Sequence, residues 1–278
     1  MSNLFSGLEA FGLGKLQNVD VYSAGEGGNK DAAVVEKPKI TEADILFDKG
    51  YSCPVCDKEF KAKTVKTGKV KLISADTDLR PKYQLVDSLK YDAVVCPHCG
   101  YAALNRFFNY MMSNQAKLIK EQISVNFKGL STDGEIYSYD DAIARHKLAL
   151  LNTIVKKGKT SERAYTCLKL AWLNRGKLEA LPTDTKDYEA IKKQLEAEEH
   201  ELISNAYEGF LSAFSKETFP MCGMDEITLT YLIADLARRC NKYDEASRWI
   251  SKVLISREAN ERIKSKAREI KDLIKQGE

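Results

Sequence analysis

The 278-residue sequence has no apolar run close to the roughly 20 residues that a membrane helix needs. It also lacks a secretory signal, because its start carries no basic cluster and Glu9 interrupts its apolar residues. The formal net charge is only +3, which gives no general attraction to nucleic acid. No nucleophile–base arrangement is visible in the sequence, and the three histidines stand apart from one another. We therefore expect a cytoplasmic protein that has no membrane span and no evident catalytic centre.

Four of the seven cysteines form two Cys-x-x-Cys pairs that are separated by 39 residues. In a reducing compartment such pairs hold metal or perform redox chemistry more often than they form disulfides. Two intervening residues let both sulfur atoms of a pair face one ion, and four thiolates complete a tetrahedral zinc site. Asp57 and Gly100 follow the two pairs, where such a turn favours positive φ. We therefore predict a structural Zn²⁺ site with the ligands Cys53, Cys56, Cys96 and Cys99.

Other chemistries fit these cysteines less well. A thioredoxin-like redox site needs one pair beside a βαβ unit, and the pattern shows no such unit. Catalytic zinc needs an open coordination position, which four thiolates do not leave. Iron is held by the same kind of ligand set, so the sequence does not distinguish zinc from iron.

Short strands are predicted between the two cysteine pairs. Apolar and charged residues alternate over Phe60–Thr64 and Val70–Leu72, with a turn at Thr67-Gly68 and a third strand over Tyr91–Val95. The first two strands would form a hairpin over residues 58–71 that carries lysines on one face. Such a face could contact nucleic-acid phosphates, although nearby aspartates favour a merely solvated surface. The candidate nucleic-acid-binding residues are Lys61, Lys63, Lys69 and Lys71.

From Tyr101 onward the apolar spacing is helical. Two breaks, at Pro182 and at Pro220–Gly223, divide the region after residue 136 into helices near 139–155, 161–178, 186–216, 226–240, 243–256 and 260–275. Small and aromatic residues recur in the spacing of tetratricopeptide (TPR) repeats, with a generic helical bundle as the alternative. The predicted fold class is therefore α+β, mostly α, with a small four-cysteine, zinc-ribbon-like β module before a TPR-like helical repeat or bundle.

This pattern divides the chain into four regions. Residues 1–40 are rich in Gly, Lys, Glu and Ala and are predicted to be a disordered tail, within which an apolar run from Leu4 to Leu16 is a candidate docking peptide. Residues 41–100 form the zinc-ribbon-like module, which should begin with a helix start at Thr41. Residues 101–135 are connecting helices, and residues 136–278 are the TPR-like domain.

Six segments at and around the cysteine pairs form a distinctive set: Phe47–Lys49, Tyr51–Cys56, Lys58–Phe60, Asp76–Tyr83, Leu89–Asp92 and Val95–Ala103. These segments resemble the uncharacterised bacterial family called domain of unknown function 2225. The opening, Gly7-Leu8-Glu9 and Phe11–Gly14, resembles Firmicutes members. The resemblance implies a zinc-ribbon-like head and a helical-repeat tail, and it implies no activity.

Three hypotheses of function follow. The first is a non-enzymatic adaptor or scaffold whose helical groove binds a protein or peptide partner. The second is nucleic-acid binding through the lysine-bearing hairpin. The third is an enzyme that uses the 76–83 loop, whose candidate residues are Asp76, Asp78, Arg80 and Tyr83. A fourth motif, Gly158-Lys159-Thr160, resembles the end of a phosphate-binding loop but lacks its first glycine, so we interpret it as a helix–helix turn.

Overall fold

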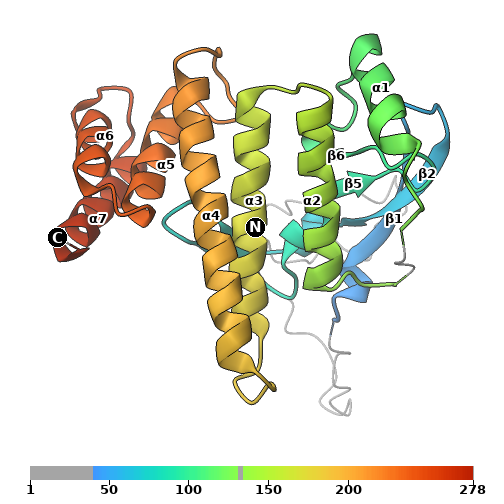
Figure 1. Ribbon diagram of the computed structural model, residues 1–278. Coiled ribbons are helices and arrows are strands. Elements are labelled where there is room, and N and C mark those ends of the chain that lie inside the picture. Colours follow the sequence, from blue (N-terminus) through green and yellow to red (C-terminus); the bar gives the residue numbers. More distant parts are fainter. Residues whose placement is uncertain (1–39, 131–133, 278) are drawn as a thin grey trace, which may run out of the picture. The chain divides into compact units, whose positions relative to one another are not determined.

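The computed structural model describes residues 40–130 and 134–277. Residues 1–39 of the predicted tail, with its apolar run, lie outside the described residues. In the part of the chain that the structure describes, the strands form separate two-stranded antiparallel sheets (Figure 1). These are β1 (Leu46–Ser52) with β2 (Glu59–Val65), β3 (Leu72–Ala75) with β4 (Pro81–Tyr83), and β5 (Ala93–Val95) with β6 (Ala102–Leu104).

Helices make up the rest of the regular structure. The short helix α1 (Ser113–Ile119) continues as a π-helical turn over Lys120–Ser124. It is followed by α2 (Tyr139–Val155), α3 (Thr160–Ala180), α4 (Tyr188–Phe214), α5 (Glu226–Arg239), α6 (Tyr243–Ile255) and α7 (Glu261–Gly277). Helices that are neighbours in sequence pack side by side, as α2, α3 and α4 do in Figure 1. The α+β, mostly α, fold class is confirmed.

The helix starts agree with the side chains that precede them. Ser138 and Asp141 form a reciprocal capping box at α2, in which Asp141 N donates to Ser138 Oγ at 3.1 Å and Ser138 N donates to Asp141 Oδ2 at 2.9 Å. At α5, the Asp225 carboxylate accepts a hydrogen bond of 2.7 Å from Thr228 N. These contacts satisfy backbone N–H groups that the first turn of a helix leaves without partners.

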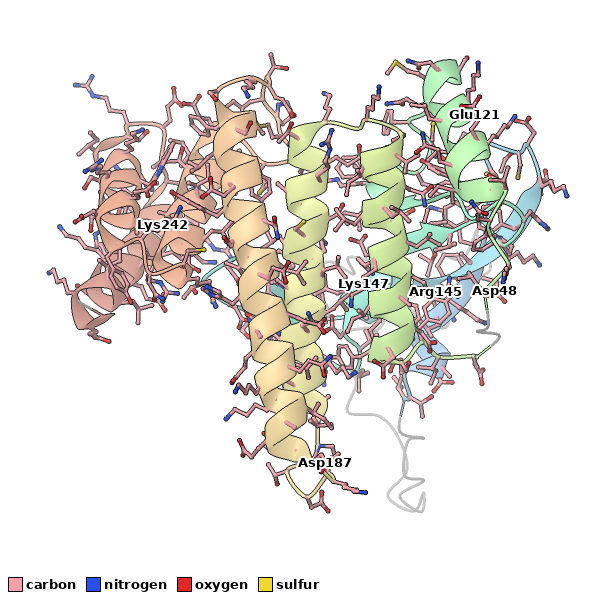
Figure 2. The ribbon with its side chains drawn as sticks, in the orientation of Figure 1. Asp48, Glu121, Arg145, Lys147, Asp187 and Lys242 are labelled. Atoms are coloured by element: carbon pink, nitrogen blue, oxygen red, sulfur yellow. The ribbon has the colours of Figure 1, made fainter. Side chains whose placement is uncertain are left out.

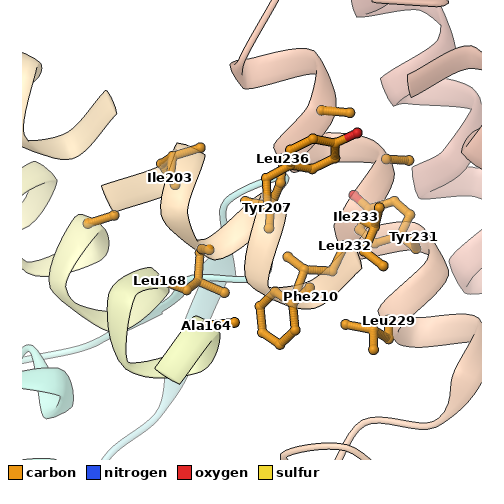
Figure 3. Packing of buried hydrophobic residues seen from close by; sticks show 14 of the residues in the cluster. Ala164, Leu168, Ile203, Tyr207, Phe210, Leu229, Tyr231, Leu232, Ile233 and Leu236 are labelled. Atoms are coloured by element: carbon orange, nitrogen blue, oxygen red, sulfur yellow. The ribbon is translucent and has the colours of Figure 1, made fainter. Parts of the chain in front are cut away.

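The main core lies between α3, α4 and α5 (Figure 3). Leu168 of α3, Phe210 of α4 and Leu232 of α5 are almost fully buried there. Gly209 lets α3 and α4 approach closely, because a Cβ at this position would lie 2.8 Å from the Ala164 Cβ. Apolar burial at roughly 25 cal/mol per Å² makes this core the main stabilising element of the helical part.

The predicted hairpin over Lys58–Lys71 is wrong. Strand β2 pairs with β1, which places Tyr51 opposite Phe60, and β3 pairs with β4. An alternating pattern indicates a strand but does not identify the neighbour of that strand. Here the first cysteine pair reverses the chain, so the nearest partner of β2 is the strand before the cysteines rather than the segment after it.

Two predicted helix starts are also wrong. Residues 102–104 form the buried strand β6, followed by a 3-10 turn over Asn105–Phe107, where a helix was expected from Tyr101. The predicted start at Thr41 is only a 3-10 turn over Ala43–Ile45, which leads directly into β1. In both places pairing with a neighbouring strand outweighs the local helical spacing.

No helix in the described ranges is both long and apolar enough to cross a membrane. The region boundaries at residues 41, 101 and 136 stay predictions.

Candidate metal centre

The first cysteine pair forms the turn of the β1–β2 hairpin. Cys53 N donates to Lys58 O at 3.0 Å, and Asp57 N donates to Cys53 O at 2.9 Å. Asp57 has a φ of 61°, a conformation that Asp tolerates better than most residues. The turn thereby holds Cys53 and Cys56 close together at one end of the hairpin.

The second pair repeats this turn between β5 and β6. Cys96 N donates to Tyr101 O at 2.8 Å, and Gly100 N donates to Cys96 O at 3.1 Å. Gly100 has a φ of 74°, and a Cβ on it would lie 2.6 Å from the Phe127 ring. Both the backbone conformation and the available space therefore favour glycine at this position.

The two hairpins bring the four sulfur atoms together. Cys53 Sγ lies 3.6 Å from Cys99 Sγ, and Cys56 Sγ lies 3.7 Å from Cys96 Sγ. All four sulfur atoms lie within 4.8 Å of one another. Four thiolates at about 2.3 Å from a tetrahedral ion would be about 3.8 Å apart, so the sulfur positions fit such an ion. These cysteines could therefore hold a metal ion, and the tetrahedral thiolate set suits zinc as well as iron.

The sulfur cluster is shielded from solvent. Cys53, Cys96 and Cys99 are buried, and Cys56 is half-buried. Hydrogen bonds with Cys53 and Cys99 lower the pKa of the Cys96 thiol. The hydrogen bond with Cys96 raises the pKa of Cys53, and hydrogen bonds with Cys53 and Cys96 raise the pKa of Cys99. A metal ion that binds all four sulfurs as thiolates must therefore displace protons from the cluster.

Aromatic side chains pack beside the cluster. Phe108 contacts Tyr51 and Tyr101, with ring centroids 5.5 Å and 4.9 Å apart. The Tyr101 hydroxyl donates to the Phe108 carbonyl at 3.0 Å, so this buried polar group is satisfied. These rings join the two hairpins to the segment that follows β6.

Asn152 connects the second cysteine turn to α2. Its side-chain amide donates to Gly100 O at 3.1 Å and to Leu148 O at 2.9 Å, and the residue is fully buried. Sequence reasoning missed this residue, because one amide within a helix belongs to no motif. His98 is exposed, and its Nε2 lies 3.3 Å from the Glu59 carbonyl oxygen.

The four predicted lysines do not share one hairpin face. Lys61 is exposed on β2, while Lys63 lies opposite Asp48 on β1 and forms a 3.0 Å ion pair with it (Asp48 is labelled in Figure 2). Lys69 and Lys71 are exposed between β2 and β3, outside the β1–β2 pair.

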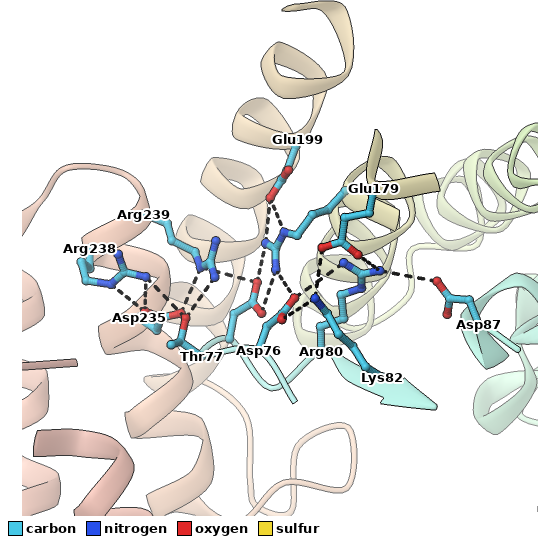
Figure 4. A network of polar contacts seen from close by, with 12 residues as sticks. Asp76, Thr77, Arg80, Lys82, Asp87, Glu179, Glu199, Asp235, Arg238 and Arg239 are labelled. Atoms are coloured by element: carbon cyan, nitrogen blue, oxygen red, sulfur yellow. Dashed lines mark hydrogen bonds and ion pairs between the residues drawn. The ribbon is translucent and has the colours of Figure 1, made fainter. Parts of the chain in front are cut away.

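The loop between β3 and β4 enters an ion-pair network that includes Asp76 and Arg239 (Figure 4). Asp78 is fully buried, and its carboxylate lies 2.7 Å from Arg175 of α3 and 3.6 Å from Arg239 of α5. Burial alone would raise the pKa of Asp78, but Arg175 and Arg239 outweigh burial and lower it. The loop is thereby fixed to helices that lie about a hundred or more residues further along the chain.

Neighbouring loop residues extend this network. Arg80 lies 3.1 Å from Glu179 and 3.7 Å from Asp87, and Asp76 lies 3.0 Å from Arg175. Thr77 Oγ1 donates to Asp235 at 2.8 Å, and Asp235 also pairs with Arg238 at 2.7 Å. Of the four predicted loop residues, Asp76, Asp78 and Arg80 therefore lie in one network. Tyr83 is half-exposed on β4, opposite Leu72.

Comparison with known proteins gives one match. A family model described as "Uncharacterized protein conserved in bacteria (DUF2225)" matches residues 46–274. No curated protein and no solved structure matches the chain. The matched range contains all four clustered cysteines and every helix from α1 to α6.

Proposed function

The chain belongs to the bacterial DUF2225 family, and we propose that it acts as a non-enzymatic adaptor in which a structural zinc ion fixes the cysteine-bearing hairpins. The observation that carries this proposal is the closed set of four sulfur atoms at tetrahedral spacing. Four thiolates leave no coordination position for a substrate or an activated water, so a zinc ion here would stabilise structure rather than catalyse a reaction.

The helical part supports the second half of the proposal, a TPR-like array that binds a protein or peptide partner. Its helices contact mainly their neighbours in sequence, as the units of a repeat array do. Ala164 and Gly209 allow the close crossing of α3 and α4, and Ala234 and Ala246 are fully buried in the following pair. Helix α7 buries Ile270 and Ile274, and charged residues cover its other face, as expected for a capping helix.

The role of the zinc ion can be tested by metal analysis. We expect one zinc ion per chain in the purified protein, and loss of zinc in Cys53→Ser and Cys96→Ser. Cys167→Ser is the matched control, because Cys167 is buried in α3 outside the cluster. Protease cleavage within residues 45–104 should rise in the first two variants and not in the control. An unchanged 1:1 zinc content in Cys53→Ser would contradict the proposal.

Partner binding needs a separate test. Leu151 and Ile154 are about half exposed on α2, whereas Ala142, Ile143 and Ala149 of the same helix are buried. Affinity capture from a bacterial lysate would compare the zinc-loaded protein with Leu151→Asp/Ile154→Asp, and with Lys193→Asp as an exposed control on α4. A partner captured by the wild type and the control but not by the double variant supports the proposal. Capture of no partner by the wild-type protein removes its main support.

One observation favours nucleic-acid binding as a second candidate function. Lys61, Lys69 and Lys71 are exposed, and none of them forms an ion pair with the described residues. Binding to random RNA or DNA that weakens steeply with salt, and is lost in Lys61→Ala/Lys69→Ala/Lys71→Ala, would support this candidate. Lys63→Ala serves as the control, because Lys63 is already paired with Asp48. The third hypothesis, an enzyme at the 76–83 loop, has less support, because Asp76, Asp78 and Arg80 are held by internal ion pairs.

A further inference from the structure

A cavity of about 730 Å³ lies where three segments remote in sequence meet. They are the segment from Arg106 to Met112, the turn between α2 and α3 at Gly158, and the loop between α4 and α5 around Met221. This volume falls within the range of sites that bind small molecules. The cavity is distinct from the metal centre, because none of the four clustered cysteines lines it.

One side of the cavity is apolar and adaptable. It is lined by Phe107, Tyr110 and three methionines, Met111, Met112 and Met221. Tyr110 is 74% exposed and Met112 is 60% exposed, which is unusual for side chains of this size. Methionine thioethers adapt to ligands of different shape and make favourable contacts with aromatic rings. This wall therefore suits an apolar, preferably aromatic, group.

The charged side chains of the cavity are unevenly paired. Glu162 forms a 2.7 Å ion pair with Lys156, and Glu217 accepts hydrogen bonds from Ser161 N at 3.1 Å and from Ser161 Oγ at 2.5 Å. In contrast, neither Arg106 nor Lys159 has a carboxylate oxygen within 4 Å among the described residues. Arg106 donates through Nη1 to the Cys222 carbonyl, and its guanidinium lies over the Phe107 and Tyr165 rings. Both acids of the wall are thus already bound to neighbours, whereas the positive charges of Arg106 and Lys159 are not offset by a carboxylate in contact with them.

The Glu217 carboxylate also argues against a phosphate ligand at the start of α3. The first backbone N–H groups of a helix attract anions, but here Ser161 N already donates to Glu217. The Gly158-Lys159-Thr160 motif therefore does not act as a phosphate loop. Lys159 remains exposed at the cavity, and it precedes the first residue of α3.

We propose that this cavity binds a small organic carboxylate, with its apolar body against Tyr110 and the three methionines and its charged group facing Arg106 and Lys159. The site does not depend on the adaptor role proposed above, because it involves neither the metal centre nor the α2 face.

Methyl NMR of the zinc-loaded full-length protein, labelled at methionine, tests the proposal. The probe is 4-phenylbutanoate, whose ring changes the signals of methyl groups that it contacts. The probes 4-phenylbutanol and 4-phenylbutylammonium have the same body with a neutral or a positive end. We expect the carboxylate to shift the signals of Met111, Met112 and Met221. Met224 is an internal control, because it does not line the cavity.

The charge requirement is tested by Lys159→Gln, with Lys157→Gln as the matched control outside the cavity. We expect Lys159→Gln to weaken 4-phenylbutanoate binding about threefold to fivefold, as for the loss of one exposed ion pair, and Lys157→Gln to leave it unchanged. An unchanged Met224 signal shows that each variant is folded. Equal affinity for the three probes, equal effects of the two variants, or no shift of the three cavity methionines would each overturn the proposal.

Discussion

Replacing Asp78 with Asn should destabilise the protein by about 3 kcal/mol. The carboxylate is fully buried and lies 2.7 Å from Arg175. Removing one member of a buried ion pair costs about 3–5 kcal/mol, because the other charge stays buried without its partner. Arg175 keeps contacts with Asp76 at 3.0 Å and Glu199 at 2.7 Å, and Arg239 keeps Asp235 at 3.0 Å. These remaining partners place the expected loss at the lower end of that range.

Urea unfolding of the purified protein measures this loss. With an m value of about 3 kcal/mol/M for a chain of this size, the midpoint should fall by about 1 M. Asp272→Asn is the matched control, because Asp272 is 69% exposed and lies 3.9 Å from Lys275. The control should lose less than about 0.5 kcal/mol. If the two variants unfold at the same urea concentration, the network does not contribute as argued.

The same variant carries a pH signature. The pKa of Asp78 is lowered in the folded protein, so its charge contributes stability above the unfolded pKa of about 4. That contribution is lost as the pH falls through the folded pKa. Asp78→Asn should therefore differ most from the wild type at neutral pH and least in acid. A difference that stays constant down to pH 2 would contradict this linkage.

The remaining predictions concern His146, Gly100 and Asn152. Burial lowers the pKa of His146 from 6.5 to about 4, although the charge of Asp92 acts to raise it. The free energy of unfolding should therefore fall as the pH drops below 6.5, by about 2 kcal/mol at pH 5. His146→Gln should remove this part of the pH dependence of the urea midpoint, and a wild-type midpoint that is equal at pH 7 and pH 5 would refute it. Gly100→Ala should lower the melting temperature more than Gly129→Ala does. Both glycines have positive φ, but only Gly100 has a ring within 4 Å of the added methyl group. Equal losses would show that the Phe127 contact does not matter. Asn152→Leu should lower the free energy of unfolding by about 1–3 kcal/mol, because Gly100 O would lose its side-chain donor inside the core. A variant as stable as the wild type would contradict this role.

Local signals in the sequence predicted helices α2 to α7 and the cysteine cluster well. The helices from α2 to α7 begin and end within about two residues of their predicted bounds, because caps and apolar spacing act over one or two turns. The cysteine spacing and the turn residues Asp57 and Gly100 likewise act within a few residues, and the four sulfur atoms do lie together.

Contacts between remote segments could not be predicted in the same way. The alternation over residues 60–64 indicated a strand, but the β1 partner was decided by the chain reversal at Cys53–Cys56. The charged 76–83 loop was a candidate active site in the sequence, because nothing local reveals that Arg175 and Arg239 meet it in the folded chain. The amide of Asn152 and the cavity near Tyr110 also depend on segments that only folding brings together.

The sequence by itself therefore determined helices α2 to α7 and the identity of the clustered cysteines, since capping, periodicity and turn geometry involve residues a few positions apart. Only the tertiary structure decided which strands pair, which arginines form ion pairs with the buried carboxylates, and how the two cysteine hairpins join into one cluster of four sulfur atoms. These outcomes depend on burial and charge pairing between segments up to about 160 residues apart, which no local pattern encodes.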